Sequence, residues 1–183
     1  MREVDRRTRV SRRVFLRGAA TAGPAAALAA AGMGISAQAA WAQGVKSLAP
    51  ATMATLVRMA RDIYPHDQIA DSYYVKAAAP WDEKAAGDPA LKAMLETGVA
   101  ALDADATARF RAPYLGVADE ADRLVLLHAI EPGAFFQKLR SDLVVSLYNQ
   151  HDLWAKFGYE GASAQFGGYL HRGFNDIDWV AKS

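Results

Sequence analysis

The chain has 183 residues, of which 52% are hydrophobic and 22% charged, a composition typical of one folded domain with an appended segment. It contains no cysteine, which excludes disulfides, iron–sulfur clusters and covalently attached haem. Seven of the 21 basic residues but only two of the 20 acidic ones lie before residue 40, so the rest of the chain is acidic and lacks the basic stripe of a nucleic-acid-binding protein.

The first 42 residues have the three parts of a secretory signal. Residues 2–17 carry the seven arginines, residues 18–35 form a mildly apolar run of Ala and Gly, and two small-x-small cleavage motifs follow within 37–42. The arginine-rich part resembles the twin-arginine export motif, which addresses proteins that cross a membrane already folded. We therefore predict a signal peptide over 1–42 and a periplasmic location reached through the twin-arginine translocase. The motif residues are Ser11, Arg12, Arg13, Phe15 and Leu16.

The apolar run is also nearly long enough to span a bilayer, which takes about 20 apolar residues. Because it consists mostly of Ala and Gly and contains Pro24, it is poorly suited to anchor the chain in a membrane, and we favour a signal peptide that is cleaved. Retention as an uncleaved signal anchor is the alternative that the sequence leaves open.

Residues 43–157 have the apolar spacing of amphipathic helices and are expected to form the folded body. The first helix follows Pro50 and ends at Pro65. The second is expected to start at a capping Asp71 and to be interrupted or restarted at Pro80. The apolar positions of the first helix are Met53, Leu56, Val57, Ala60 and Tyr64.

The second half of the body has further start signals. Asp88 is expected to cap a helix whose first residue is Pro89. Residues 103–116 are interpreted as a short connecting helix that ends near Pro113, and a helix over 118–131 opens with acids that suit the helix dipole. The last helix follows the break at Pro132 and Gly133. The helix after Asp88 has the expected core face Leu91, Leu95, Val99 and Leu102. For the helix over 118–131 the expected core face is Ala121, Leu124, Leu127 and His128, and for the last helix it is Phe136, Leu139, Leu143 and Leu147.

These segments predict an all-α fold, a small bundle of about five helices. Residues 158–183 differ, because they contain five glycines and five aromatic residues and no helical period. Disordered segments are poor in aromatic residues, so this irregular Gly- and aromatic-rich tail is expected to be ordered against a surface. That surface is either the helical body or another protein, and aromatic anchors between glycines favour another protein.

The tail contains a succession of short motifs. They are Trp154, Gly158-Tyr159-Glu160-Gly161, Gly167-Gly168-Tyr169, Arg172-Gly173-Phe174 and Asp176-Ile177-Asp178-Trp179. This succession resembles the C-terminal signature of the gluconate 2-dehydrogenase subunit 3 family. Residues 61–67 and Tyr73 also resemble the first helix of that family and the turn after it, whereas residues 80–130 match only in helical character.

The resemblance implies a small subunit, not catalytic alone, of a periplasmic flavin-dependent dehydrogenase for sugars or sugar acids. In such complexes an FAD-containing flavoprotein of the glucose–methanol–choline type is the large subunit, and a multihaem cytochrome c often takes electrons to quinones. The small subunit carries the twin-arginine leader, so the flavoprotein would be exported with it into a membrane-associated complex. The substrate would be set by the large subunit. Partner-docking residues implied here are Trp154, Tyr159, Gly167, Gly168, Tyr169, Arg172, Phe174, Asp176, Asp178 and Trp179.

No motif in the chain points to catalysis or to a bound cofactor. The sequence has no Gly-x-Gly-x-x-Gly opening a helix after a strand, no Gly-x-Ser-x-Gly, no P-loop and no His-Glu-x-x-His. Two groups have metal-ligand residue types, His66 with Asp67 and Asp71, and His171 with Asp176 and Asp178. A solvated turn explains the first group and bonds to backbone amides or Arg172 explain the second, so we predict no metal site. The alternative function is a self-sufficient periplasmic metal-binding protein or enzyme.

Overall fold

The computed structural model describes residues 45–171, which belong to one unit of the chain. This part is 73% helical, with six α-helices and no strand, so the predicted all-α fold is confirmed. The export-motif residues Ser11, Arg12, Arg13, Phe15 and Leu16 and the tail residues Arg172, Phe174, Asp176, Asp178 and Trp179 lie outside the described residues.

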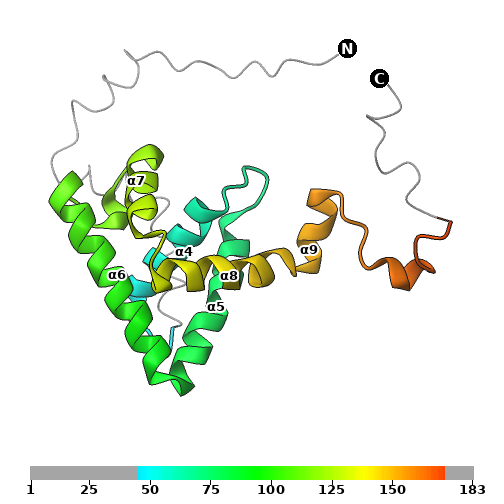
Figure 1. Cartoon of the computed structure of the whole chain (residues 1–183), viewed down its shortest axis with the longest axis horizontal. Coiled ribbons are helices and arrows are strands. Elements are labelled where there is room, and N and C mark those ends of the chain that lie inside the picture. Colours follow the sequence, from blue (N-terminus) through cyan, green and yellow to red (C-terminus); the bar gives the residue numbers. More distant parts are fainter. Residues whose placement is uncertain (1–44, 172–183) are drawn as a thin grey trace, which may run out of the picture. The chain divides into compact units, whose positions relative to one another are not determined.

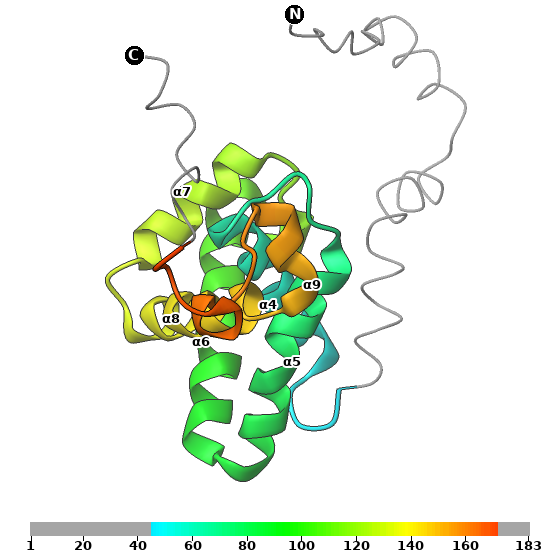
Figure 2. The ribbon, with the colours of Figure 1, turned by 90° about the vertical axis from the view of Figure 1, so that its right-hand side faces the viewer.

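Five longer helices and one short one follow each other along the chain (Figure 1). They are α4 (Pro50–Ile63), α5 (Asp71–Gly87), α6 (Pro89–Phe110), α7 (Glu120–Ile130), α8 (Ala134–Tyr148) and α9 (His151–Trp154). Short 3-10 turns form η3 (Tyr114–Gly116), η4 (Ala155–Phe157) and η5 (Ser163–Phe166). Figures 1 and 2 show α5 and α6 converging at the turn that joins them.

The core of the bundle lies around α4, which contacts α5, α6, α7 and α8. Met53, Leu56 and Met59 of α4 are fully buried, as are Tyr74 and Trp81 of α5. Burying one large apolar side chain contributes about 1.5–3 kcal/mol, so these contacts supply much of the stability of the bundle.

The predicted start of α6 is confirmed. The Asp88 carboxylate accepts hydrogen bonds from the backbone N–H groups of Ala90 and Leu91, both at 3.0 Å, and Pro89 occupies the first turn. Such a cap satisfies donors that have no partner inside the helix and is worth about 1 kcal/mol. The predicted stripes of α6 and α8 are also buried, namely Leu91, Leu95, Val99 and Leu102, and Phe136, Leu139, Leu143 and Leu147.

Two predictions about α5 are wrong. Asp71 is the first residue of the helix and not its cap, and its carboxylate pairs with Arg61 at 3.2 Å. Pro80 lies inside a helix that continues without a break. A proline in a helix interior costs about 3 kcal/mol, and burial of the adjacent Trp81 and of Ala77, three residues earlier, offsets this cost.

The connecting helix predicted over 103–116 does not exist as a separate element. The stripe of α6 continues through the buried Ala106, so residues up to 110 belong to α6. Asp103 accepts a hydrogen bond from the backbone N–H of Tyr114 at 2.9 Å and does not begin a new helix. Arg111, in the left-handed region with φ 59°, ends α6.

The predicted core face of α7 is wrong, because the helix is rotated about its axis relative to the prediction. Leu127 is buried as predicted, but its buried neighbours are Arg123 and Leu126. Arg123 is buried because its guanidinium donates to both carboxylate oxygens of Asp62, at 2.8 and 3.2 Å, and to two backbone carbonyls. The ion pair turns the helix toward α4. The predicted core positions that are exposed or only partly buried are Ala121, Leu124 and His128.

Candidate functional site

The tail begins at an aromatic cluster that joins α8 to the loop between α4 and α5. His66 Nε2 lies 2.7 Å from the Tyr148 hydroxyl, and the His66 ring packs edge-on against Phe157 with 5.0 Å between ring centres. Tyr148 also packs against Tyr64. Burial lowers the pKa of His66, and the nearby Arg61 guanidinium lowers it further. The cluster therefore favours the neutral imidazole as an aromatic and hydrogen-bonding member.

Trp154 organises the first turn of the tail. Its indole N–H donates to the Tyr148 carbonyl at 2.9 Å, and its ring lies against the rings of His151 and Tyr159, with centres 4.1 and 5.1 Å apart. The Tyr159 backbone N–H donates to the Trp154 carbonyl at 2.9 Å, and Gly158 between them has φ 71°. Two of the predicted docking residues, Trp154 and Tyr159, are therefore in contact.

A second turn positions Tyr169. Gly161 is buried with φ 105°, and a Cβ at this position would lie 3.5 Å from the indole ring of the first turn. Farther along, the Gly168 N–H donates to the Ser163 carbonyl at 2.8 Å. Gly167 and Gly168 have φ 83° and 79°, a region that favours glycine. The predicted residues Gly167 and Gly168 thus shape the turn that ends at Tyr169.

The tail exposes large apolar side chains. Tyr169 is 63% and Leu170 77% exposed, and Tyr159 and Phe166 are about half exposed. Single exposed apolar residues are normal on a protein surface, but four large ones within residues 159–170 are an unusual local concentration. Figure 1 shows η5 beyond the end of α8 and away from α5, so this part of the tail does not lie over α5.

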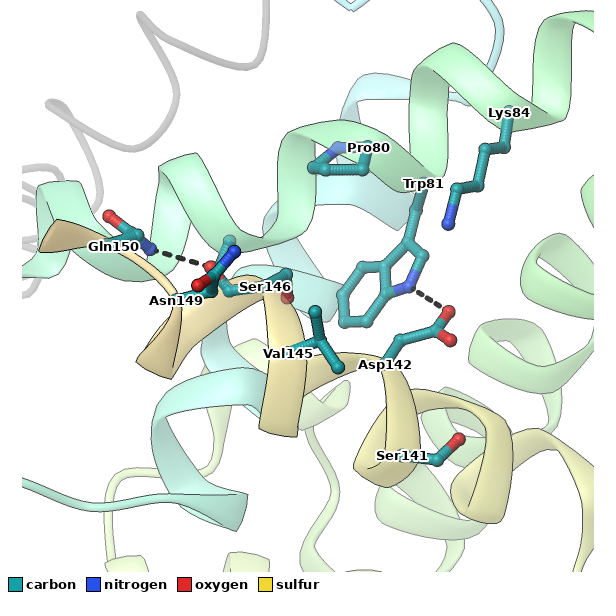
Figure 3. Close-up of a pocket in the computed structure, with 10 residues that line it drawn as sticks. Pro80, Trp81, Lys84, Ser141, Asp142, Val145, Ser146, Asn149 and Gln150 are labelled. Carbon is teal, nitrogen blue, oxygen red and sulfur yellow. Dashed lines mark hydrogen bonds between the residues drawn. The ribbon is translucent and has the colours of Figure 1, made fainter. Parts of the chain in front are cut away.

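A groove that the sequence did not predict lies between α5 and α8. Its volume is about 460 Å³. Figure 3 shows Asn149 and Gln150 at one end, Lys84 at the other end, and Pro80 and Val145 along its length. The sequence feature nearest to the groove is Pro80, a proline inside a helical pattern, which marks this stretch of α5 as irregular.

Two buried polar atoms of the groove lining, Ser146 Oγ and Gln150 Oε1, have no hydrogen-bond partner within residues 45–171. Gln150 is 7% exposed, and its Nε2 donates to the carbonyls of Tyr73 and Ser146, both at 3.0 Å. These two bonds fix the orientation of the amide, so its oxygen is an unused acceptor. Leaving such an atom unpaired costs about 1–3 kcal/mol.

Two carboxylates hold the chain where it enters the bundle. Asp82 accepts hydrogen bonds from three consecutive backbone N–H groups, residues 46–48, at 2.8 to 2.9 Å. Glu96 accepts from the Ala49 N–H at 2.7 Å. Burial opposes ionisation of Asp82, but the three N–H groups outweigh it and lower the pKa of this carboxyl.

The residues considered as metal ligands have other partners. His66 bonds to Tyr148, and Asp71 pairs with Arg61. Among residues 45–171, no three His, Asp or Glu side chains are arranged to hold a metal ion. The aspartates considered with His171 lie outside the described residues. Within the same range no helix is both long enough and apolar enough to cross a membrane.

The part of the chain that the structure describes thus combines an exposed aromatic tail, a groove between α5 and α8 and a pair of carboxylates that hold the entering chain. The tail offers contacts to another polypeptide, because it presents large apolar side chains to solvent. Comparison of the chain with protein-family models, with curated proteins and with solved structures gave no match.

Proposed function

We propose that this chain is the non-catalytic small subunit of a membrane-associated periplasmic flavin-dependent dehydrogenase, similar to subunit 3 of gluconate 2-dehydrogenase. In this role it supports the export, assembly and stability of an FAD-containing large subunit of the glucose–methanol–choline type. A multihaem cytochrome c completes those complexes that pass electrons to quinones. The FAD and the haem belong to the partners, and no residue of this chain is assigned to either.

The observation that carries the proposal is the exposed apolar surface of the tail. Tyr169 and Leu170 are mostly in solvent, yet the backbone that carries them is shaped by specific hydrogen bonds and by glycines with positive φ. A surface arranged before binding lowers the entropy cost of association. Covering these side chains with a partner also removes apolar area from water, worth about 25 cal/mol per Å².

The start of the folded body supports the export part of the proposal. The Asp82 contacts begin at Lys46, and the predicted signal peptide ends at residue 42. The contacts that attach the start of the described body thus follow the predicted signal peptide along the chain. This arrangement suits a subunit that brings a folded, FAD-loaded protein to the twin-arginine translocase.

Co-purification tests the subunit part. The full chain is expressed together with its neighbouring genes, among which the proposal predicts a flavoprotein of the glucose–methanol–choline type, and a tag on this chain is used for capture. We expect the flavoprotein to co-elute with bound FAD, and the double variant Tyr169→Ser/Leu170→Ser to weaken capture at least about tenfold. Val125→Ser on α7, a comparably exposed apolar position, is the matched control and retains capture. Elution of this chain as a monomer beside a soluble, FAD-loaded flavoprotein contradicts the proposal.

A second experiment tests the export part. The variant Arg12→Lys/Arg13→Lys changes the export motif and leaves the helical body intact. We expect dehydrogenase activity to remain in the cytoplasm in this variant. Periplasmic activity equal to that of the wild type would rule out the escort role but not the subunit role. Stoichiometric metal or a chromophore in this chain purified alone would favour the alternative of a self-sufficient metal-binding protein or enzyme.

A further inference from the structure

We infer that the signal peptidase of the export route cuts this chain after Ala39 and not after Ala42. The inference rests on the export part of the proposed function, because that part supplies the peptidase. Each of the two bonds follows a small-x-small motif, so the sequence leaves both open. The contacts that fix the start of the folded body distinguish the two bonds, and the signal peptide then comprises residues 1–39.

Residues 46–48 are fixed to the body by one carboxylate. Asp82 accepts hydrogen bonds from their three N–H groups, at 2.8 to 2.9 Å. In an extended strand successive N–H groups point to opposite sides, so these three reach one carboxylate only because the backbone bends here. Leu48 is 4% exposed, and Glu96 accepts from the next N–H at 2.7 Å. A protease can extend this segment only by breaking these contacts.

A peptidase needs an extended substrate on both sides of the bond that it cuts, because main-chain hydrogen bonds hold such a segment in the active site. Active sites are clefts, so the bond to be cut lies below the enzyme surface. A chain exported by the twin-arginine route reaches the peptidase already folded, with the Asp82 contacts in place. The residues between the cut bond and the first fixed residue must therefore be long enough to cross the rim of the cleft.

The two bonds differ in the length of chain that separates them from the fixed segment. A cut after Ala42 leaves residues 43–45, which span at most about 11 Å when extended. That length is about the diameter of one helix with its side chains, and Val45 is itself partly buried. A cut after Ala39 leaves residues 40–45, which span about 20–22 Å. The upstream bond can thus enter a cleft while the bundle stays outside it.

The reaction is the hydrolysis of one peptide bond. Water adds across the bond after Ala39, which leaves a carboxylate on that residue and an ammonium group on Ala40. The mature chain then begins with Ala40, Trp41 and Ala42, which a cut after Ala42 would remove with the leader. The two products differ by one tryptophan and two alanines, so the intact mass and the N-terminal sequence distinguish them.

The N-terminus of the exported protein tests the inference. The full chain is expressed with its neighbouring genes, isolated from the periplasm and characterised by N-terminal sequencing and intact mass. We expect Ala40 as the first residue. Ala39→Leu removes the small residue that the peptidase needs but keeps the downstream motif, and we expect it to remain uncut, whereas Ala42→Leu is cut as the wild type is. A start at Gln43, in the wild type or in Ala39→Leu, overturns the inference.

An insertion tests the physical reason for this choice. Six residues of Gly and Ser between Gln43 and Gly44 add about 20 Å of extended chain and change none of the side chains that hold residues 46–49. We expect a start at Gln43 to appear beside the start at Ala40. The same insertion between Val4 and Asp5, upstream of the export motif, is the matched control and leaves Ala40 as the first residue. An insertion before Gly44 that produces no start at Gln43 overturns the inference.

Two further outcomes separate this inference from the proposed function. An exported wild-type chain that keeps its leader overturns the inference, while the proposed function stands. Wild-type chain that is found only in the cytoplasm, with its leader intact, overturns the export part of the proposed function and this inference together.

Discussion

The indole N–H of Trp154 donates to the backbone carbonyl of Tyr148, 2.9 Å away, and so ties the first turn of the tail to the last residue of α8. Trp154→Phe keeps an aromatic ring but removes the donor. We expect the free energy of unfolding to fall by about 1 kcal/mol, the contribution of one hydrogen bond. We also expect faster amide exchange at Tyr159 and Gly168, measured by mass spectrometry, with the exchange in α4 unchanged. Wild-type exchange at Tyr159 would show that Trp154 does not organise the turn.

The buried pair of Asp62 and Arg123 joins α4 to α7, and Tyr114 donates its hydroxyl to the same carboxylate at 2.7 Å. Arg123→Met leaves the Asp62 charge buried with fewer partners, which is expected to cost about 3–5 kcal/mol in the free energy of unfolding. Urea unfolding measures this loss.

The double variant Asp62→Leu/Arg123→Met is the control for this pair. It removes both charges, and Tyr114 loses its acceptor, so we expect it to be more stable than Arg123→Met alone and to recover part of the loss. A single variant as stable as the wild type would show that the pair does not hold α7 against α4.

Gly98 of α6 allows the close approach of α8, because a Cβ at this position would lie 2.5 Å from the Phe135 ring. Alanine favours a helix over glycine by about 1 kcal/mol, but the overlap forces the ring or the helix to move. We expect Gly98→Ala to lower the free energy of unfolding by about 1–3 kcal/mol, as overpacked cores do. The matched control is Gly87→Ala in α5, where a Cβ meets nothing within 4 Å and no loss of stability is expected.

Asp82 makes the attachment of the entering chain dependent on pH. Its pKa in the folded protein lies below the usual value of 3.8 because three backbone N–H groups bond the ionised form. Its contribution to stability is therefore complete above the unfolded-state pKa and is lost as the pH falls through the folded-state pKa. We expect Asp82→Asn to be less stable than the wild type at pH 7, and the two unfolding curves to converge in acid. A constant difference between the curves at every pH would contradict this assignment.

Much of the fold follows from local sequence. The start of α6 at Asp88 and the stripes of α6 and α8 were predicted correctly, because capping and helical periodicity depend on residues within one or two turns of each other. The irregular character of residues 158–171 also follows from local sequence, since glycine and aromatic content do not depend on distant partners.

The candidate site was only partly visible in the sequence. Trp154, Tyr159 and Tyr169 were identified as tail residues through a family resemblance, but their different roles were not. The structure makes Trp154 the internal support of the turn and leaves Tyr169 in solvent. The groove was missed, because its unpaired atoms on Ser146 and Gln150 depend on how α8 lies against α5.

The sequence alone therefore determined the all-α class, the start of α6 and the stripes of α6 and α8, since each follows from neighbouring residues. Tertiary structure decided that α5 runs through Pro80, that α7 buries Arg123, and that His66 meets Tyr148 across 82 positions of the chain. The physical reason is that packing and burial supply free energies comparable to or larger than local preferences. A buried tryptophan can thus keep a helix continuous through a proline, and a buried ion pair can decide which face of a helix is buried. The partners in these contacts are distant in sequence, so no local pattern reveals them.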